Sequence, residues 1–256
     1  MMKNVEEALK KRPIMIAGPC SVESEEQIDK TAKFVASKGL KFLRGGAYKP
    51  RTSPDSFQGL GKKGAEMLKR AAERHGLYTV SEVMTDEDLK ESYDYIDIVQ
   101  IGSRSMASYG LIKQIAELTK DDRKPVLLKR HFGATITELL KAADYLSYYG
   151  NDNIFFCLRG IRTFEQIDSC FRFTPDISGI IELKDKTEKP IIFDPSHSAG
   201  LRRYVGKISE TALCAGADGL IIEIHPEPDN ALSDKDQALF FDDFSELLED
   251  IGFNQD

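Results

Sequence analysis

Eight short apolar segments recur along the chain, and a segment with helical periodicity follows each of them. Rich in Ile, Leu, Val and Phe, they read "IMIAGPC", "KFLRGG", "LYTVSEV", "IDIVQIG", "PVLLKR", "IFFCLRG", "PIIFDPSH" and "GLIIEIHP". The helical pattern is clearest at residues 24–39 and 135–150, both of which end in glycine. Strands that alternate with helices predict a parallel sheet, and eight such units predict an α/β fold of the (β/α)8 TIM barrel type.

A doubly wound open sheet would show the same alternation. It is disfavoured because no G-x-G-x-x-G follows the first predicted strand. A chain of 256 residues with 41% apolar composition suits one barrel domain with a sizeable core. We therefore expect a single domain over residues 1–256, with a short N-terminal helical segment and no appended regulatory domain.

The composition argues against several classes of protein. A formal net charge of −7 is unlike the basic surface of a general nucleic-acid binder. No apolar run approaches the roughly 18 residues of a membrane span, and the N-terminal residues contain no apolar signal core, so we expect a cytoplasmic protein. The four cysteines form no C-x-x-C pair, which argues against a disulfide framework or a structural zinc site.

The predicted strands begin apolar and end polar. The residues at or just past their C-terminal ends are Cys20, Arg44, Glu82, Arg104, Lys129, Arg159, His197 and Glu223. In a barrel all these ends meet at one face, where active sites are built. One such residue alone would be an ordinary loop charge, whereas eight in register predict a functional site.

Two kinds of chemistry are predicted at this face. The cations are Arg44, Lys49, Arg51, Arg104, Lys129 and Arg159. They would repel one another unless anions bind, which predicts a substrate with phosphate and carboxylate groups. The second set is Cys20, His197, Glu223 and Asp234. A thiolate, an imidazole and two carboxylates suit a divalent transition metal, although each residue alone has an ordinary structural explanation.

Seven stretches carry a more specific indication. They are "GPCSVES" (18–24), "KFLRGGAYKPRTSPDSFQGLG" (41–61), "QIGSRSM" (100–106), "VLLKR" (126–130), "LRGIRTFE" (158–165), "DPSHSAG" (194–200) and "EIHPEPDNALSDKDQAL" (223–239). In this order they closely resemble 3-deoxy-D-arabino-heptulosonate 7-phosphate (DAHP) synthase, in its microbial form with a barrel core. The resemblance implies a metal-dependent transferase that opens the shikimate pathway and condenses phosphoenolpyruvate with erythrose 4-phosphate and water, releasing phosphate.

The resemblance also implies a role for each site residue. Cys20, His197, Glu223 and Asp234 would hold the metal, which could be Mn, Fe, Co or Zn. Arg104 and Arg159 would bind the phosphate of phosphoenolpyruvate, Arg44 and Lys129 its carboxylate, and Arg51 and Thr52 the phosphate of the aldose. Glu82 would support the phosphoenolpyruvate site, Lys49 would lie near the reacting carbons, and the candidate catalytic residues are Lys49, His197 and Cys20. Oligomers are usual in this family, so a homo-oligomer, either a dimer or a tetramer, is expected.

Three positions depart from the pattern of that family. Leu158 stands where an acidic residue is usual, His131 lies in "RHF" where Arg-Gly-Met is usual, and Phe173 replaces a usual Asn. We expect altered packing of the loops after the fifth and sixth strands.

Two alternatives to this function stay open. One is 3-deoxy-octulosonate 8-phosphate synthase, disfavoured because it usually has Ala-Asn-Arg where this chain has "PRT" (50–52). The other is a catalytically silent barrel that acts as a binding partner. Only residues 1–13 precede the first predicted strand. We therefore expect no inhibition by phenylalanine, tyrosine or tryptophan.

Overall fold

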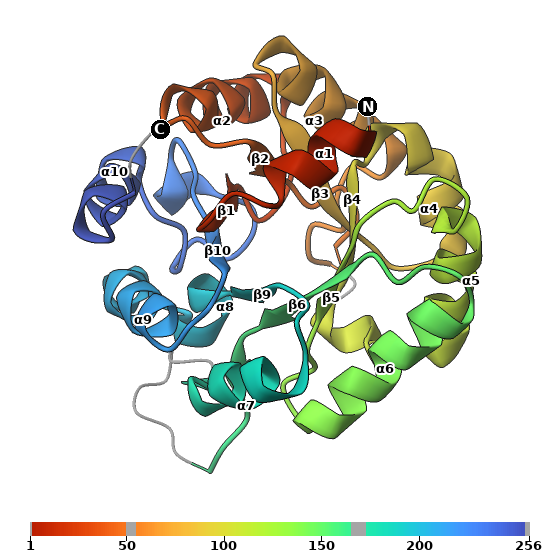
Figure 1. Cartoon of the computed structure of the whole chain (residues 1–256). Helices are drawn as coiled ribbons and strands as arrows, with labels where there is room; N and C mark the ends of the chain where they lie inside the picture. Colours follow the sequence, from red (N-terminus) through yellow and green to blue (C-terminus); the bar gives the residue numbers. More distant parts are fainter. Residues whose placement is uncertain (1, 50–54, 165–172, 254–256) are drawn as a thin grey trace.

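Eight parallel strands close into a barrel, and helices surround it (Figure 1). A computed structural model describes residues 2–49, 55–164 and 173–253 of the chain. In order around the barrel, the strands are β1 (Ile14–Gly18), β2 (Phe42–Arg44), β3 (Tyr78–Val83), β4 (Ile98–Ile101), β5 (Val126–Lys129), β6 (Ile154–Leu158), β9 (Ile191–Phe193) and β10 (Gly219–Glu223). Each strand falls within one of the eight predicted segments, so the predicted (β/α)8 barrel is confirmed.

The helices alternate with the strands along the chain. Those in the described residues are α1 (Met2–Ala8), α2 (Glu25–Ser37), α3 (Lys62–Arg74), α4 (Asp86–Ser92), α5 (Tyr109–Thr119), α6 (Ile136–Tyr148), α7 (Ser178–Lys186), α8 (Pro195–Ala199), α9 (Arg202–Cys214) and α10 (Phe241–Asp250). Short 3₁₀ turns are η1 (Tyr93–Tyr95), η2 (Ser103–Ser105) and η3 (Pro228–Asn230). None of the helices described is both long and apolar enough to cross a membrane.

The two most clearly predicted helices begin at a capping side chain and end near a glycine. Ser24 caps α2, and Thr135 forms a reciprocal capping box with Glu138 at the start of α6. Gly39 and Gly150 follow these helices with φ angles of +73° and +110°. Only glycine adopts such angles without strain, so both helices end where the sequence predicts.

Two apolar layers make up the core. One lies between the strands and the surrounding helices, and the other fills the barrel interior. The interior layer contains Val5, Ile14, Ile16, Phe42, Val80, Ile98, Leu127, Phe155, Cys157, Ile192 and Ile221. Val5 belongs to α1, which lies across one end of the barrel in Figure 1. The predicted N-terminal helical segment therefore covers the end opposite the polar strand ends.

The barrel closes between its first and last strands. β1 pairs with β10 along five residues, from Ile14 opposite Gly219 to Gly18 opposite Glu223. Past the C-terminal end of β6, a small antiparallel pair is formed by β7 (Gly160–Ile161) and β8 (Thr174–Pro175). The closed sheet brings the C-terminal strand ends to one face.

Candidate active site

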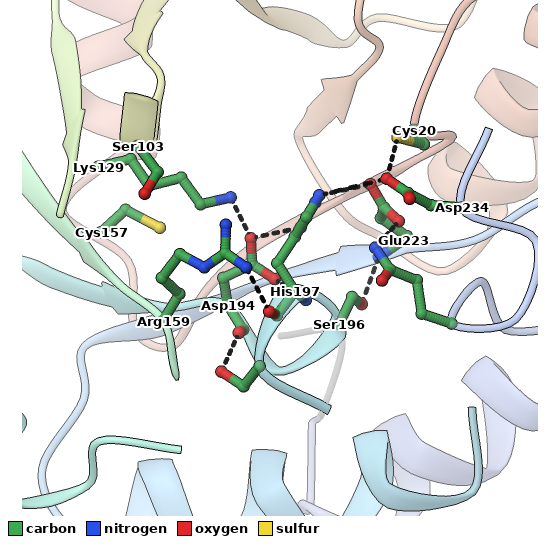
Figure 2. A network of polar contacts seen from close by, with 12 residues as sticks. Cys20, Ser103, Lys129, Cys157, Arg159, Asp194, Ser196, His197, Glu223 and Asp234 are labelled. Carbon is green, nitrogen blue, oxygen red and sulfur yellow. Dashed lines mark hydrogen bonds and ion pairs between the residues drawn. The ribbon is translucent and has the colours of Figure 1, made fainter. Parts of the chain in front are cut away.

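Four side chains with metal-binding donor atoms meet at this face. Cys20 follows β1, His197 lies in α8, Glu223 ends β10, and Asp234 lies in the loop after β10. One ligand atom from each lies within 4.8 Å of the other three. Cys20 Sγ lies 3.1 Å from Asp234 Oδ2, and His197 Nε2 lies 3.4 Å from Glu223 Oε1 (Figure 2). The structure thus brings together the four residues that the sequence singled out, in a donor set suited to a divalent transition metal.

His197 is held by Asp194, the residue that caps α8. Asp194 Oδ1 accepts a hydrogen bond from the His197 backbone N–H at 2.8 Å, and Asp194 Oδ2 lies 2.8 Å from His197 Nδ1. Pro195 occupies the first helical position, where its fixed φ suits a helix start. Because the ring is anchored through Nδ1, its Nε2 faces Glu223 and Asp234. Burial lowers the pKa of His197, which favours the neutral ring that a metal ligand requires.

Glu223 is fully buried and contacts side chains from α8, from β2 and from the loop after β10. Its backbone N–H donates to Ser196 Oγ at 3.0 Å, and its Oε2 accepts from Gln237 Nε2 at 2.6 Å. Its Oε1 accepts from Arg44 Nη1 at 2.6 Å. Burial would raise the pKa of Glu223, but interaction with His197 and with the Arg44 guanidinium outweighs burial and lowers it. The carboxylate is therefore ionised at neutral pH.

Cys20 lies against β2 with its sulfur pointing into the site. Its Sγ accepts hydrogen bonds from Lys49 Nζ and Ser233 Oγ, both at 2.9 Å. Gly18, two residues before Cys20, has a φ of +151°, and a Cβ there would lie 2.0 Å from the Arg44 backbone oxygen, so only glycine fits. Burial raises the pKa of the Cys20 thiol to about 12. A divalent cation would supply the positive charge that a thiolate needs at this position.

Buried cations surround these four side chains. Arg44, Lys49, Lys129 and Arg159 are between 4% and 8% exposed. Lys129 Nζ forms an ion pair with Asp194 Oδ2, and Arg159 Nη2 donates to the His197 backbone oxygen at 2.6 Å. The sequence predicted that these cations would repel one another unless a substrate anion bound. The Arg44 and Lys129 pairs correct that reasoning, because two of the cations are already balanced by buried carboxylates of the protein.

The remaining predicted residues differ in their placement. Arg104 is exposed and lies in η2, after β4. Glu82 is half-buried near the end of β3 and lies against Gly102, where an added Cβ would fall 1.7 Å from Glu82 Oε1. Arg51 and Thr52 lie outside the described residues.

Sequence reasoning missed four residues that support the site: Asp194, Ser196, Ser233 and Gln237. Asp194 could have been found, because an Asp followed by Pro and, three residues on, by His is typical of a capped helix start. The other three have no such local pattern. Their contacts with Glu223 and Cys20 depend on the tertiary fold.

Comparison with known proteins agrees with this geometry. The family model for the DAHP synthetase I family matches residues 3–252. The chain belongs to this family. A Thermotoga maritima protein named phospho-2-dehydro-3-deoxyheptonate aldolase is 48% identical over 237 residues, which cover 93% of this chain and 68% of that protein. The crystal structure of the DAHP synthase from Thermotoga maritima has a TM-score of 0.87 at 47% identity, and the match covers 93% of this chain and 68% of that one.

Family membership confirms both the resemblance read from the motifs and the expected enzyme class, 3-deoxy-7-phosphoheptulonate synthase. Relatives from the alternative enzyme family are more distant. A Legionella pneumophila protein named 2-dehydro-3-deoxyphosphooctonate aldolase is 26% identical, over 96% of this chain and 93% of that protein.

Proposed function

We propose that this member of the DAHP synthetase I family condenses phosphoenolpyruvate with erythrose 4-phosphate and water, giving DAHP and phosphate. The observation that carries the proposal is that a metal-type donor set and a group of buried cations lie together at one end of the barrel. Two phosphorylated reactants require positive charge, and attack on an aldehyde is aided by a Lewis acid. A catalytically silent barrel would need neither.

Cys20, His197, Glu223 and Asp234 fit a divalent transition metal, which we propose to be Mn, Fe, Co or Zn. When bound, such an ion would supply Lewis-acid polarisation of a substrate oxygen or activation of a water molecule. Glu223 is ionised and His197 neutral before any ion binds, because of the pKa shifts described above. Both are thus already in the form that coordinates a metal.

The cations divide between the two ends of phosphoenolpyruvate. In the proposal, Arg44 and Lys129 hold its carboxylate, and Arg104 and Arg159 hold its phosphate. Arg44 and Lys129 are each paired with one protein carboxylate, but a guanidinium has five N–H donors and an ammonium has three. Both side chains therefore keep donors for a second carboxylate.

Lys49 has the position of a proton donor. Its Nζ lies 2.9 Å from Cys20 Sγ and 3.0 Å from the Cys20 backbone oxygen, next to the candidate metal ligands. As C3 of phosphoenolpyruvate attacks the aldehyde carbon, water adds at C2 and loses a proton, and the aldehyde oxygen gains negative charge and takes up a proton. The tetrahedral C2 then expels phosphate. We propose that Lys49 delivers the proton to the aldehyde oxygen, that His197 contributes as a metal ligand, and that Arg51 and Thr52 hold the phosphate of the aldose.

One assay tests the proposed function and separates it from its alternatives. Phosphate release from phosphoenolpyruvate is measured with erythrose 4-phosphate and, separately, with a five-carbon aldose 5-phosphate. We expect turnover with the four-carbon aldose only. Turnover with the five-carbon aldose alone would indicate the octulosonate enzyme, and no turnover with either would indicate a silent barrel.

Three further expectations stay predictions. We propose a single catalytic domain over residues 1–256, a homo-oligomer of two or four copies, and a cytoplasmic location. Sedimentation equilibrium of the purified chain measures the number of copies. A monomer at micromolar concentration would contradict the second expectation.

A further inference from the structure

Two guanidinium groups and two aromatic rings form one stack beside the cations of the site. The guanidinium carbon of Arg159 lies 4.5 Å from the centroid of the Phe173 ring. Phe173 stacks on Phe132, with ring centroids 5.0 Å apart and an interplanar angle of 22°. On the side of Phe132, the guanidinium carbon of Arg162 lies 4.9 Å from that ring's centroid. We call Phe132 and Phe173 the aromatic shelf.

Main-chain hydrogen bonds anchor the shelf to different segments of the barrel face. Phe132 follows β5, and its backbone oxygen accepts from Arg162 N at 2.8 Å. Phe173 precedes β8, and its N–H donates to the Ser198 backbone oxygen at 3.2 Å. Gly160, next to Arg159, leaves room for Phe173, since an added Cβ would fall 2.5 Å from the Phe173 Cβ. The backbone positions of both residues are therefore fixed to the barrel face.

The shelf limits the orientation of Arg159 in two ways. The guanidinium carbon of Arg159 lies over the Phe173 ring, which is a favourable cation–π arrangement. The His197 backbone oxygen accepts from Arg159 Nη2 at 2.6 Å, which sets the rotation of the group within its own plane. An arginine side chain otherwise loses much rotamer freedom when it binds an anion. Because both contacts already hold the guanidinium in the folded chain, that loss occurs on folding and not on binding.

We propose that the aromatic shelf is a positioning device that orients Arg159 to receive the phosphate of phosphoenolpyruvate, with Phe173 as the positioning residue in contact with it. The inference rests on the proposed function, in which Arg159 binds that phosphate. Both rings are only half-buried, and neither belongs to the two apolar core layers. Their described ring contacts are with each other, with His131 and with the two arginines. Contact with cations thus accounts for the shelf better than core packing does.

Phe173→Leu tests the shelf, because leucine keeps an apolar side chain but has no aromatic face. We expect the KM for phosphoenolpyruvate to rise roughly five- to thirty-fold, because the arginine side chain would then lose its rotamer freedom on binding. The KM for erythrose 4-phosphate and kcat should stay within about twofold. Phe173→Tyr, which restores the aromatic face, should return the KM for phosphoenolpyruvate to the wild-type value. The matched control is Phe164→Leu, at a fully exposed phenylalanine in the same region, and it should change neither KM.

Arg159→Lys separates failure of the shelf from failure of the proposed function. If Arg159→Lys raises the KM for phosphoenolpyruvate and Phe173→Leu leaves it unchanged, the shelf is wrong and the function stands. A wild-type chain that consumes no phosphoenolpyruvate would overturn both. Should Phe173→Leu fail to fold, Phe132→Leu removes the outer ring and leaves Phe173 against Arg159. It should raise the same KM by a smaller factor, and an unchanged KM would overturn the shelf.

Discussion

Asp194→Asn should separate the charge of this side chain from its role as a helix cap. Asp194 is fully buried, and its carboxylate oxygens contact Lys129 Nζ, the His197 backbone N–H and His197 Nδ1. Asparagine keeps one oxygen that can accept from the backbone N–H, so the cap of α8 should persist. The negative charge between Lys129 and His197 is lost.

Two effects of known size follow from this loss. Lys129, 4% exposed, becomes a buried ammonium without its ion-pair partner, which should lower the free energy of unfolding by about 3–5 kcal/mol. His197 loses the carboxylate at Nδ1 that orients its ring, which should weaken metal binding by about 10- to 100-fold. Burial would raise the pKa of Asp194, but His197 and Lys129 outweigh burial and hold it well below its usual value. The carboxylate is thus fully ionised at neutral pH, and both effects should appear there in full.

Urea unfolding measures the first effect, and titration against a competing chelator measures the second. Asp176→Asn is the matched control. Asp176 is also buried, forms an ion pair with Arg130 and accepts from the Gly179 N–H at the start of α7, but these described partners include no candidate metal ligand. It should lose similar stability and keep its metal affinity. If Asp194→Asn binds metal as tightly as the wild type under conditions where it is folded, the proposed role of Asp194 is refuted.

Three further predictions concern the metal, the aldose and a buried lysine. Dialysis against a chelator should abolish turnover, and a divalent transition metal should restore it, whereas Cys20→Ala should not retain stoichiometric metal; full activity of rigorously metal-free enzyme would contradict the assignment. Arg51→Ala should raise the KM for erythrose 4-phosphate much more than that for phosphoenolpyruvate, because a charge-assisted phosphate contact contributes roughly 1.5–3 kcal/mol; equal changes would argue against this role. Lys124 is buried, donates to the Ile96 backbone oxygen at 2.8 Å, and burial lowers its pKa to about 8 from the ordinary 10.5. Between these two values the unfolded chain holds a proton that the folded chain has released, so stability should rise with pH there by up to about 1.4 kcal/mol per unit. In urea unfolding at pH 8, 9 and 10, Lys124→Met should show a smaller rise than the wild type, and equal slopes would count against a depressed pKa.

The fold could be predicted from sequence because each barrel strand carries its own local pattern. A short apolar run followed by a polar residue and a helical segment is visible without any tertiary information, and glycines mark the helix ends. The convergence of Cys20, His197, Glu223 and Asp234 then follows from barrel geometry together with the motifs.

The partners of the buried cations could not be predicted in the same way. Nothing in the local sequence indicates that Arg44 pairs with Glu223, because the two residues come from strands far apart in the chain. Phe173 stood out only as a departure from the family pattern. Its contact with Arg159 depends on the three-dimensional arrangement of two loops. Tertiary packing decides which side chains from distant segments pair, and the hydrophobic periodicity of the sequence does not indicate these pairs.

Because β1 pairs with β10, the first and last strands of the barrel, the site can form only after nearly the whole chain has been synthesised. Gly18 lies opposite Glu223 in this pairing, so Cys20 and Glu223 come from opposite ends of the chain. A ribosome adds roughly 5–20 residues per second, and during that time the nascent barrel exposes an unpaired edge at β1. The donor set cannot assemble until the last strand has emerged and closed the ring. An ion held by these residues would therefore bridge the first and last strands, and would stabilise the closed ring over an open sheet of the same strands.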